Sequence, residues 1–187
     1  METIFIKNMV CDRCKMVVKN ELEKLQLIVG QIELGRVEVL SENIEPVKSD
    51  LKKNLQKLGF ELLDNENDVL NELIKTHLIN YIEDKSGNEE NISDYLSCKL
   101  LKDYPTLSNF FSKENHITIE KYLIKLKIEK AKQLIQENKL NFSEIAYTLG
   151  YNNLSHLSTQ FKKEVGASLS EFKSKNNYNR KPIDKII

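Results

Sequence analysis

The chain has 187 residues, enough for one large domain or two small ones. Its 28 basic and 28 acidic residues cancel, so the overall charge indicates no class of partner, and three prolines and six glycines are too few for a turn-rich all-β protein or a low-complexity chain. We find no apolar run of bilayer length and no basic segment before an apolar stretch at the N-terminus, so we expect a cytoplasmic protein without a membrane partner.

The zero net charge hides an uneven distribution along the chain. Residues 1–67 hold 10 basic and 12 acidic residues, a net charge of −2, whereas residues 99–187 hold 16 basic and 9 acidic residues, a net charge of +7. A basic half is typical of a protein that binds a polyanion such as nucleic acid. Lysine-rich helix faces are also often merely solvated, so charge alone leaves both interpretations open.

The first 66 residues predict a small α/β domain. The apolar pattern indicates, in chain order, a strand at 3–7, a helix at 11–26, strands at 28–34 and 36–40, a helix at 46–58 and a strand at 60–63. Gly59 is expected to end the second helix. Along the first helix, Met16, Val17 and Leu22 are expected on the buried face. The order β-α-β-β-α-β predicts a ferredoxin-like sandwich.

Two cysteines, Cys11 and Cys14, lie at the first strand-to-helix turn. Because a helix N-terminus favours thiolate, we expect lowered pKa values for both thiols. Two soft thiolates that face one ion favour Cu(I), whereas Zn(II) would need further ligands. The same spacing is typical of a redox dithiol, and the pair can also belong to a scaffold in which the thiols have no role. All three interpretations remain open.

The first loop reads Met9-x-Cys11-x-x-Cys14, and the last strand is preceded by Leu58-Gly59-Phe60. In a βαββαβ unit, this combination resembles a heavy-metal-associated domain, over about the first 65 residues. The resemblance implies that Cys11 and Cys14 are metal ligands and that the cofactor is Cu(I) or another soft metal, with no other cofactor. Asn8 stands where that family usually has glycine, and Asp12 and Arg13 stand where it usually has small residues.

From Val69 onward the pattern changes to long helices, and two helix pairs recur about fifty residues apart. The clearer pair is expected at 141–149 and 154–163, with a turn after Gly150. Polar side chains on its second helix can reach base edges, and lysines there can pair with phosphates. The DNA-facing candidates are Ser155, His156, Thr159, Gln160, Lys162 and Lys163. The alternative is a helical hairpin that is polar because it is solvated.

The earlier pair is expected around 92–100 and 105–111, with Pro105 in the first turn of its second helix. Its DNA-facing candidates are Thr106, Ser108, Asn109 and Lys113. Between the pairs, a long amphipathic helix is expected at about 119–136. We expect it to expose five basic residues: Lys121, Lys125, Lys127, Lys130 and Lys132.

Several segments of the helical half form a specific set: Leu126-Lys127-Ile128-Glu129-Lys130-Ala131, Glu144-Ile145-Ala146, Leu149-Gly150-Tyr151, Leu157 with Phe161-Lys162-Lys163, and Gly166-x-Ser168 with Glu171-Phe172-Lys173. Over about residues 70–175, this set resembles the DNA-binding domain of AraC/XylS-type transcription regulators. The resemblance implies seven helices and two recognition helices in successive major grooves. Leu169 replaces the family's usual proline, Lys127 its arginine, and 114–116 lack its glycine.

Together these patterns predict an α+β chain with a heavy-metal-associated-like ferredoxin-fold domain at 1–66, an AraC-type DNA-binding domain at 67–176 and a flexible tail at 177–187. The predicted function is sequence-specific binding of double-stranded DNA in transcription regulation, responsive to a soft metal ion or to thiol state through Cys11 and Cys14. The alternative is a metal- or thiol-binding module whose helical half binds a protein. Further partners considered are a second copy of the chain and RNA polymerase. We recognise no catalytic set of residues and expect no enzyme.

Overall fold

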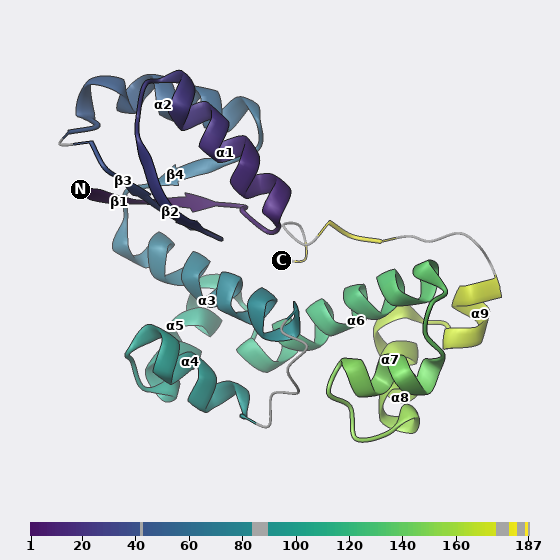
Figure 1. Ribbon diagram of the computed structural model, residues 1–187. Coiled ribbons are helices and arrows are strands. Elements are labelled where there is room, and N and C mark those ends of the chain that lie inside the picture. Colours follow the sequence, from purple (N-terminus) through teal and green to yellow (C-terminus); the bar gives the residue numbers. More distant parts are fainter. Residues whose placement is uncertain (42, 84–89, 175–179, 183–185, 187) are drawn as a thin grey trace. The chain divides into compact units, whose positions relative to one another are not determined.

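The computed structural model describes residues 1–41, 43–83, 90–174, 180–182 and 186 (Figure 1). The chain divides into two compact units, Met1–His77 and Leu78–Ile187. The division falls inside helix α3 (Glu66–Glu83), which therefore contributes residues to both units. The domain boundary predicted between residues 66 and 67 coincides with the start of α3 and stays a prediction.

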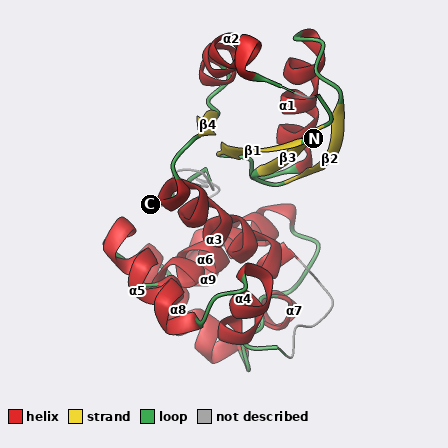
Figure 2. Cartoon of the chain, turned by 90° about the vertical axis from the view of Figure 1, so that its left-hand side faces the viewer, coloured by secondary structure: helices red, strands yellow, loops and turns green. Residues whose placement is uncertain are grey.

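The first unit contains a four-stranded antiparallel sheet. Its elements, before α3, are β1 (Glu2–Lys7), α1 (Asp12–Lys24), β2 (Val29–Glu33), β3 (Arg36–Val39), α2 (Glu45–Lys57) and β4 (Glu61–Leu63). This is the predicted order of elements, with each boundary within two residues of the expected one. The strands lie in the order β2-β3-β1-β4, and every neighbouring pair is antiparallel. Figure 2 shows α1 and α2 on the same face of the sheet.

The buried face of α1 differs from the predicted one. Val18 and Leu22 have no exposed surface, and Cys14 packs against the same core one turn earlier. Met16 is 66% exposed and Val17 is 37% exposed, so their expected burial was wrong. Residues 14, 18 and 22 follow one another at intervals of four, which places them on one side of a helix. The stripe that faces the sheet therefore begins at a cysteine.

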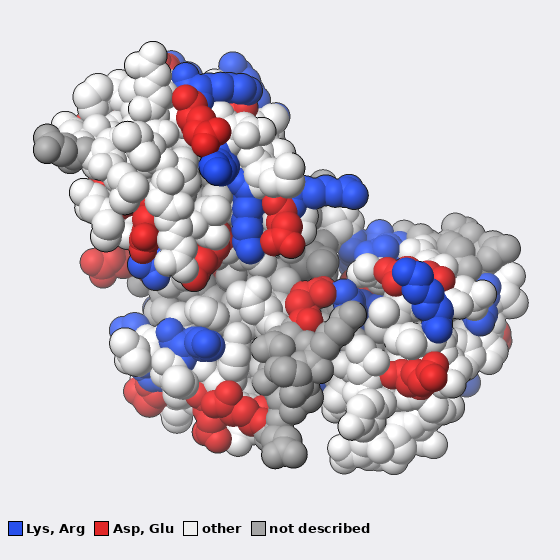
Figure 3. Space-filling model, viewed as in Figure 1, with Lys and Arg blue, Asp and Glu red and all other residues white. Residues whose placement is uncertain are grey.

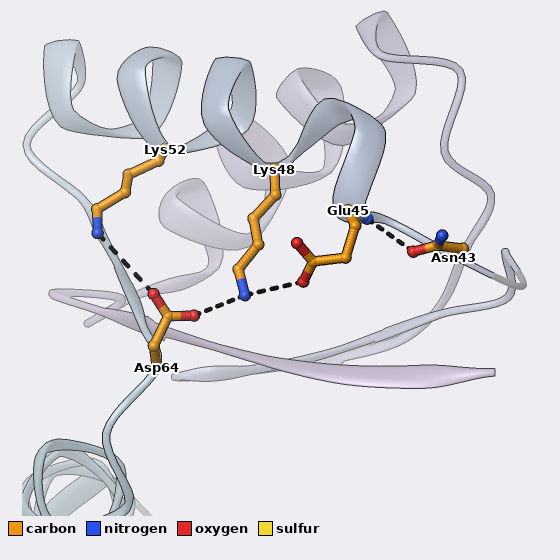
Figure 4. Close-up of polar contacts among 5 residues, drawn as sticks. All are labelled: Asn43, Glu45, Lys48, Lys52 and Asp64. Carbon is orange, nitrogen blue, oxygen red and sulfur yellow. Dashed lines mark hydrogen bonds and ion pairs between the residues drawn. The ribbon is translucent and has the colours of Figure 1, made fainter.

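A polar network at the surface joins α2 to the segment that follows β4 (Figure 4). The Lys48 Nζ atom lies 3.0 Å from Asp64 Oδ1 and 3.2 Å from Glu45 Oε1, and Lys52 Nζ lies 3.9 Å from Asp64 Oδ2. The hydrogen bonds of Lys48 with Asp64 and Glu45, above all the one with Asp64, raise the pKa of Lys48. The Asn43 Oδ1 atom accepts the backbone N–H of Glu45 at 2.9 Å, at the start of α2. Exposed ion pairs stabilise little, so the network mainly orients the chain as it leaves the sheet.

The first half of α3 packs on the sheet through two residues one turn apart. The Glu72 carboxylate accepts the backbone N–H of Asn8, in the loop between β1 and α1, at 2.8 Å. Thr76 lies against the turn between β2 and β3, because a Cβ on Gly35 would stand only 3.1 Å from Thr76 Oγ1. Gly35 also has a φ of +75°, so both space and backbone conformation require glycine there. Helix α3 therefore contacts the loop between β1 and α1 and the turn between β2 and β3.

The second unit is all helical in the part of the chain that the structure describes. It contains the end of α3 followed by α4 (Ile92–Leu100), α5 (Tyr104–Asn115), α6 (Ile119–Glu137), α7 (Phe142–Thr148), α8 (Leu154–Val165) and α9 (Leu169–Ser174). Figure 1 shows α6 running from the α4–α5 pair to the α7–α8 pair. The helices from α3 to α9 number seven, as the resemblance implied. None of the described helices combines the length and apolar character needed to cross a membrane.

The tail predicted at 177–187 falls largely outside the described residues. Only residues 180–182 and 186 of it are described. In that part of the tail, the backbone N–H of Lys181 donates to Glu129 at 3.0 Å, and the Arg180 guanidinium donates to Gln136 at 3.2 Å. These residues therefore lie against α6.

Glu72 links the stability of the first unit to pH. Its side chain is buried, and burial is the largest cause that raises its pKa above the ordinary value of 4.5. The Asn8 N–H, Lys75 and Lys7 oppose this shift, and Glu61 adds to it. The folded state thus holds the proton more tightly than the unfolded state. Stability is therefore lost as the pH rises from the unfolded value through the raised folded value.

We predict that Glu72→Gln, which keeps an oxygen acceptor and removes the charge, raises the free energy of unfolding at pH 7 by about 1 kcal/mol. The difference from wild type should shrink as the pH is lowered towards about 4, where the unfolded glutamate takes up its proton. Urea unfolding at both pH values measures this, with the exposed Glu66→Gln as the matched control. A gain in the free energy of unfolding that is independent of pH would contradict the raised pKa of Glu72.

Candidate nucleic-acid interface and thiol pair

The helix pairs α4–α5 and α7–α8 are built alike, with matching residues 50 positions apart. Four side chains at helix N-termini accept a backbone N–H three residues further on: Asn91 from Asp94 at 3.0 Å, Asn141 from Glu144 at 2.9 Å, Asp103 from Thr106 at 2.8 Å and Asn153 from His156 at 3.0 Å. Each such cap satisfies an N–H that the helix itself leaves unpaired. Both helices of each pair therefore begin at the same register.

The buried side chains of the two pairs follow the same offset. The matching residues, all buried, are Leu107 and Leu157, Phe111 and Phe161, Ile119 and Leu169, and Tyr122 and Phe172. The ring centroids of Phe111 and Tyr122 are 5.6 Å apart, and those of Phe161 and Phe172 are 5.4 Å apart. Helix α5 is thus held against α6 by the same contact that holds α8 against α9. The positions of outward side chains on α5 and α8 can therefore be compared directly.

The ten predicted DNA-facing residues all lie on α5 and α8. Eight are exposed, namely Thr106, Asn109, Lys113, Ser155, His156, Thr159, Lys162 and Lys163, and two are half-buried, namely Ser108 and Gln160. The Gln160 Nε2 atom donates to Glu164 at 3.3 Å. Ser108 corresponds to Ser158, which is also half-buried, so these serines lie at the side of the outward face.

Three exposed positions coincide when the two pairs are matched. Thr106 corresponds to His156, Asn109 to Thr159 and Lys113 to Lys163. Each helix therefore presents two polar side chains along one face, followed by a lysine in its last turn. This order places the lysine at the end of the face, beyond the two polar side chains.

The predicted basic face of α6 is wrong for most of its lysines. Among Lys121, Lys125, Lys127, Lys130 and Lys132, only Lys121 is exposed. The Lys130 Nζ atom lies 2.6 Å from Glu83, and the buried Lys132 Nζ lies 2.7 Å from the buried Glu129. Helix α6 packs against both helix pairs, which covers most of its circumference.

On the face drawn in Figure 3, lysines and arginines lie among acidic residues and form no continuous basic area.

A lysine holds the turn of the second helix pair. The Lys127 Nζ atom lies 5.2 Å from the ring centroid of Tyr151 and 3.5 Å from where a Cβ on Gly150 would stand. Burial lowers the pKa of Lys127 and raises that of Tyr151 to about 12. An ammonium over an aromatic face is attracted by the ring, more strongly when both are desolvated. Lys127 was predicted to be an exposed basic residue, and this is wrong, because α6 places its ammonium against the turn between α7 and α8.

Cys11 and Cys14 face each other at the start of α1. Their Sγ atoms are 3.4 Å apart, whereas a disulfide requires about 2.05 Å. Both sulfurs are soft donors close enough to contact one ion, so Cys11 and Cys14 are the residues that would hold a soft metal. In the described ranges the pair has no third His, Cys, Asp or Glu close enough to complete a larger ligand set.

The pKa of Cys14 is raised, so the predicted lowering is wrong for this thiol. Burial is the largest cause, and the neighbouring Cys11 adds to it, while backbone hydrogen bonds at Val10 and Cys11 oppose it. Cys14 lies at the start of the buried stripe of α1 and is half-buried, and partial desolvation disfavours the thiolate. A metal that binds this pair must displace the proton.

Asn8 occupies the position where the heavy-metal-associated family usually has glycine. Its φ is +71°, in the left-handed region that asparagine tolerates better than most residues. Its Nδ2 donates to the Gly59 carbonyl at 2.9 Å, and its own carbonyl lies 3.9 Å from Cys14 Sγ. The substitution therefore keeps the glycine-like backbone and adds a side-chain hydrogen bond to the loop.

Comparison with known proteins adds to this geometry. Residues 102–175 match the protein-family model described as a helix-turn-helix domain. The chain is similar to the HTH-type transcriptional activator RhaS of Escherichia coli strains O9:H4 and K12, with 28% identity over 124 residues, which is 65% of this chain and 38% of RhaS.

Two solved structures are also similar. The C-terminal domain of AraT, a response regulator from Geobacillus stearothermophilus, matches with 26% identity and a TM-score of 0.48, over 55% of this chain and 84% of that one. The C-terminal domain of the response regulator yesN from Fusobacterium nucleatum matches with 29% identity and a TM-score of 0.45, over 51% of this chain and 93% of that one.

Residues 102–175 of this chain are therefore a helix-turn-helix domain. The match spans 38% of the length of the curated relatives. The expectation that the chain is not an enzyme agrees with those relatives, which are named as transcriptional activators.

Helices α5 and α8 end in the same backbone conformation but with different residues, which offers a test of the repeat. His116 has a φ of +55° after α5, and Gly166 a φ of +78° after α8, and each donates its N–H to the carbonyl four residues earlier. We predict that His116→Gly stabilises the fold by about 0.5–1 kcal/mol, because glycine adopts this conformation without strain.

The reciprocal change Gly166→Ala should cost about 1 kcal/mol. A Cβ at Gly166 meets no atom within 4 Å, so its cost is conformational and not steric. Thermal unfolding of both variants provides the measurement. If both substitutions shift the midpoint temperature of unfolding in the same direction, the C-terminal ends of α5 and α8 are not equivalent.

Proposed function

We propose that this chain is a transcription regulator that binds specific sequences in double-stranded DNA. The observation that carries the proposal is the matched pair α5 and α8, whose exposed polar residues recur at equivalent positions in one register. The similarity to RhaS, an HTH-type transcriptional activator, supports it. A place in the cytoplasm follows from this function and is part of the proposal.

The outward residues divide into two roles. Thr106 and Asn109 on α5, and His156 and Thr159 on α8, lie where they can contact base edges in the major groove. The flanking candidates Ser108, Ser155 and Gln160 complete this surface. Lys113, Lys162 and Lys163 lie at the ends of the helices and pair with phosphates, which fixes register without reading sequence.

We predict that Lys163→Ala weakens binding to all DNA sequences and lowers the magnitude of the salt slope by about 1, because one phosphate contact is lost. His156→Ala should instead cost about 1–3 kcal/mol on the preferred site and little on unrelated DNA. Fluorescence anisotropy at several salt concentrations, on DNA from upstream of the gene, measures both. The exposed Lys57→Ala on α2 is the matched control.

Binding that does not depend on salt would favour the alternative function, in which the helical half contacts a protein and the first unit handles metal or thiols. A second copy of the chain and RNA polymerase remain predicted partners. The two recognition helices of one chain do not require a dimer to occupy two neighbouring stretches of major groove.

The first unit is proposed to be a ferredoxin-like domain of the heavy-metal-associated type, which binds one soft metal ion, Cu(I) by preference, through Cys11 and Cys14. The 3.4 Å separation of their Sγ atoms supports this, as does the order of strands and helices. A reversible disulfide is the competing role for the same pair, because both sulfurs are within reach of each other.

We predict that the reduced protein binds one Cu(I) per chain, and that DNA affinity changes when Cu(I) is bound. The double variant Cys11→Ser/Cys14→Ser should lose both effects, whereas Cys98→Ser, at the remaining exposed cysteine on α4, should keep them. Competition with a Cu(I) chelator and anisotropy on the same DNA provide the measurements. A DNA affinity that is equal in all cases would remove the responsiveness and leave the DNA-binding proposal intact.

A further inference from the structure

Asn8 lies between the thiol pair and α3. Its carbonyl oxygen is 3.9 Å from Cys14 Sγ, and its backbone N–H donates to the Glu72 carboxylate at 2.8 Å. Its side chain is fixed at the same time, by the hydrogen bond to the Gly59 carbonyl. With a φ of +71° and contacts on three sides, Asn8 has little freedom to move independently of any of them.

Glu72 is an unusual partner for a backbone N–H, because it is a carboxylate with only 8% of its surface exposed. The residue one turn later, Thr76, is 4% exposed and lies against Gly35. A buried carboxylate is costly unless it makes hydrogen bonds, so the Asn8 N–H has to stay in place for Glu72 to remain there. Movement of the Asn8 loop therefore acts directly on this turn of α3.

The same helix continues into the second unit. α3 is unbroken from Glu66 to Glu83, and its residues from Leu78 onward belong to the unit that carries α4 to α9. There Ile82 packs against the core shared by α6, α7 and α8, and Glu83 pairs with Lys130 of α6 at 2.6 Å. A single helix thus has one buried polar contact at the thiol loop and another set of contacts in the helix-turn-helix domain.

We propose that the hydrogen bond between the Asn8 N–H and Glu72 transmits the occupancy of Cys11 and Cys14 to α3, and so controls DNA affinity. The inference rests on the proposed function and names how its regulation operates. An ion held by both sulfurs replaces their 3.4 Å contact, so the two Sγ atoms have to shift relative to each other when it binds. Cys14 is anchored on the buried stripe of α1, so part of this adjustment falls on the loop that contains Asn8 and Cys11.

The decisive variant is Glu72→Ala, which removes the hydrogen-bond acceptor. Two variants serve as controls: Glu72→Gln keeps an acceptor, and Glu66→Ala changes an exposed residue in the first turn of the same helix. In wild type, Cu(I) should change the DNA dissociation constant by about 5–150-fold, the usual range for coupled sites. Glu72→Ala should reduce this change to less than about twofold while still binding one Cu(I) and the same DNA. Glu72→Gln and Glu66→Ala should keep the wild-type change.

A full Cu(I)-dependent change in Glu72→Ala would overturn the inference and leave the proposed function standing. The absence of a change in wild type, with Cu(I) bound, would overturn the proposed responsiveness and this inference together. If Glu72→Ala does not fold, amide hydrogen exchange on the wild-type protein tests the inference instead. Cu(I) should alter exchange by several-fold in the amides of residues 69–77, and unchanged exchange there would also overturn the inference.

Discussion

The helix-turn-helix domain depends on one helix, α6, burying more than one of its faces. Tyr122 meets Phe111 of the first helix pair, while Ile128, Ala131 and Ile135 belong to the core of the second pair. The middle of a helix covered in this way has little room for solvated side chains, and there Glu129 and Lys132 pair with each other inside the domain. Removal of one partner of such a pair is costly, because a buried charge is left alone.

Much of the fold could be predicted because its determinants are local. Asparagine and aspartate caps mark the helix starts, glycines mark turns, and apolar periodicity separates strands from helices. Asn8 and His116, where the two resemblances lead one to expect glycine, also have a local meaning. Both residues have positive φ where glycine is usual, so the backbone is kept although the residue changes.

The remaining features depend on neighbours that are distant in the sequence. The exposure of Met16, the burial of Lys132 and the raised pKa of Cys14 all follow from which face another element covers, and a periodicity of 3.6 allows more than one choice. The same holds for the candidate site. The outward residues of α8 follow from the register of a helix pair, whereas the contact of Lys127 with Tyr151 has no signal in the sequence around either residue.

The fifty-residue repeat separates most of the side chains that hold α5 and α8 in place from those that these helices expose. Thr106 belongs to both groups, because its hydroxyl donates to the cap Asp103 at 2.9 Å. Caps and aromatic pairs fix where α5 and α8 begin and how they lie, and none of these residues is among Asn109, Thr159, Lys113 or Lys163. Substitutions at these exposed positions thus carry little penalty for folding. Duplicated copies of such a gene can diverge in the sequences they recognise, one helix at a time, without first acquiring compensating changes in the core.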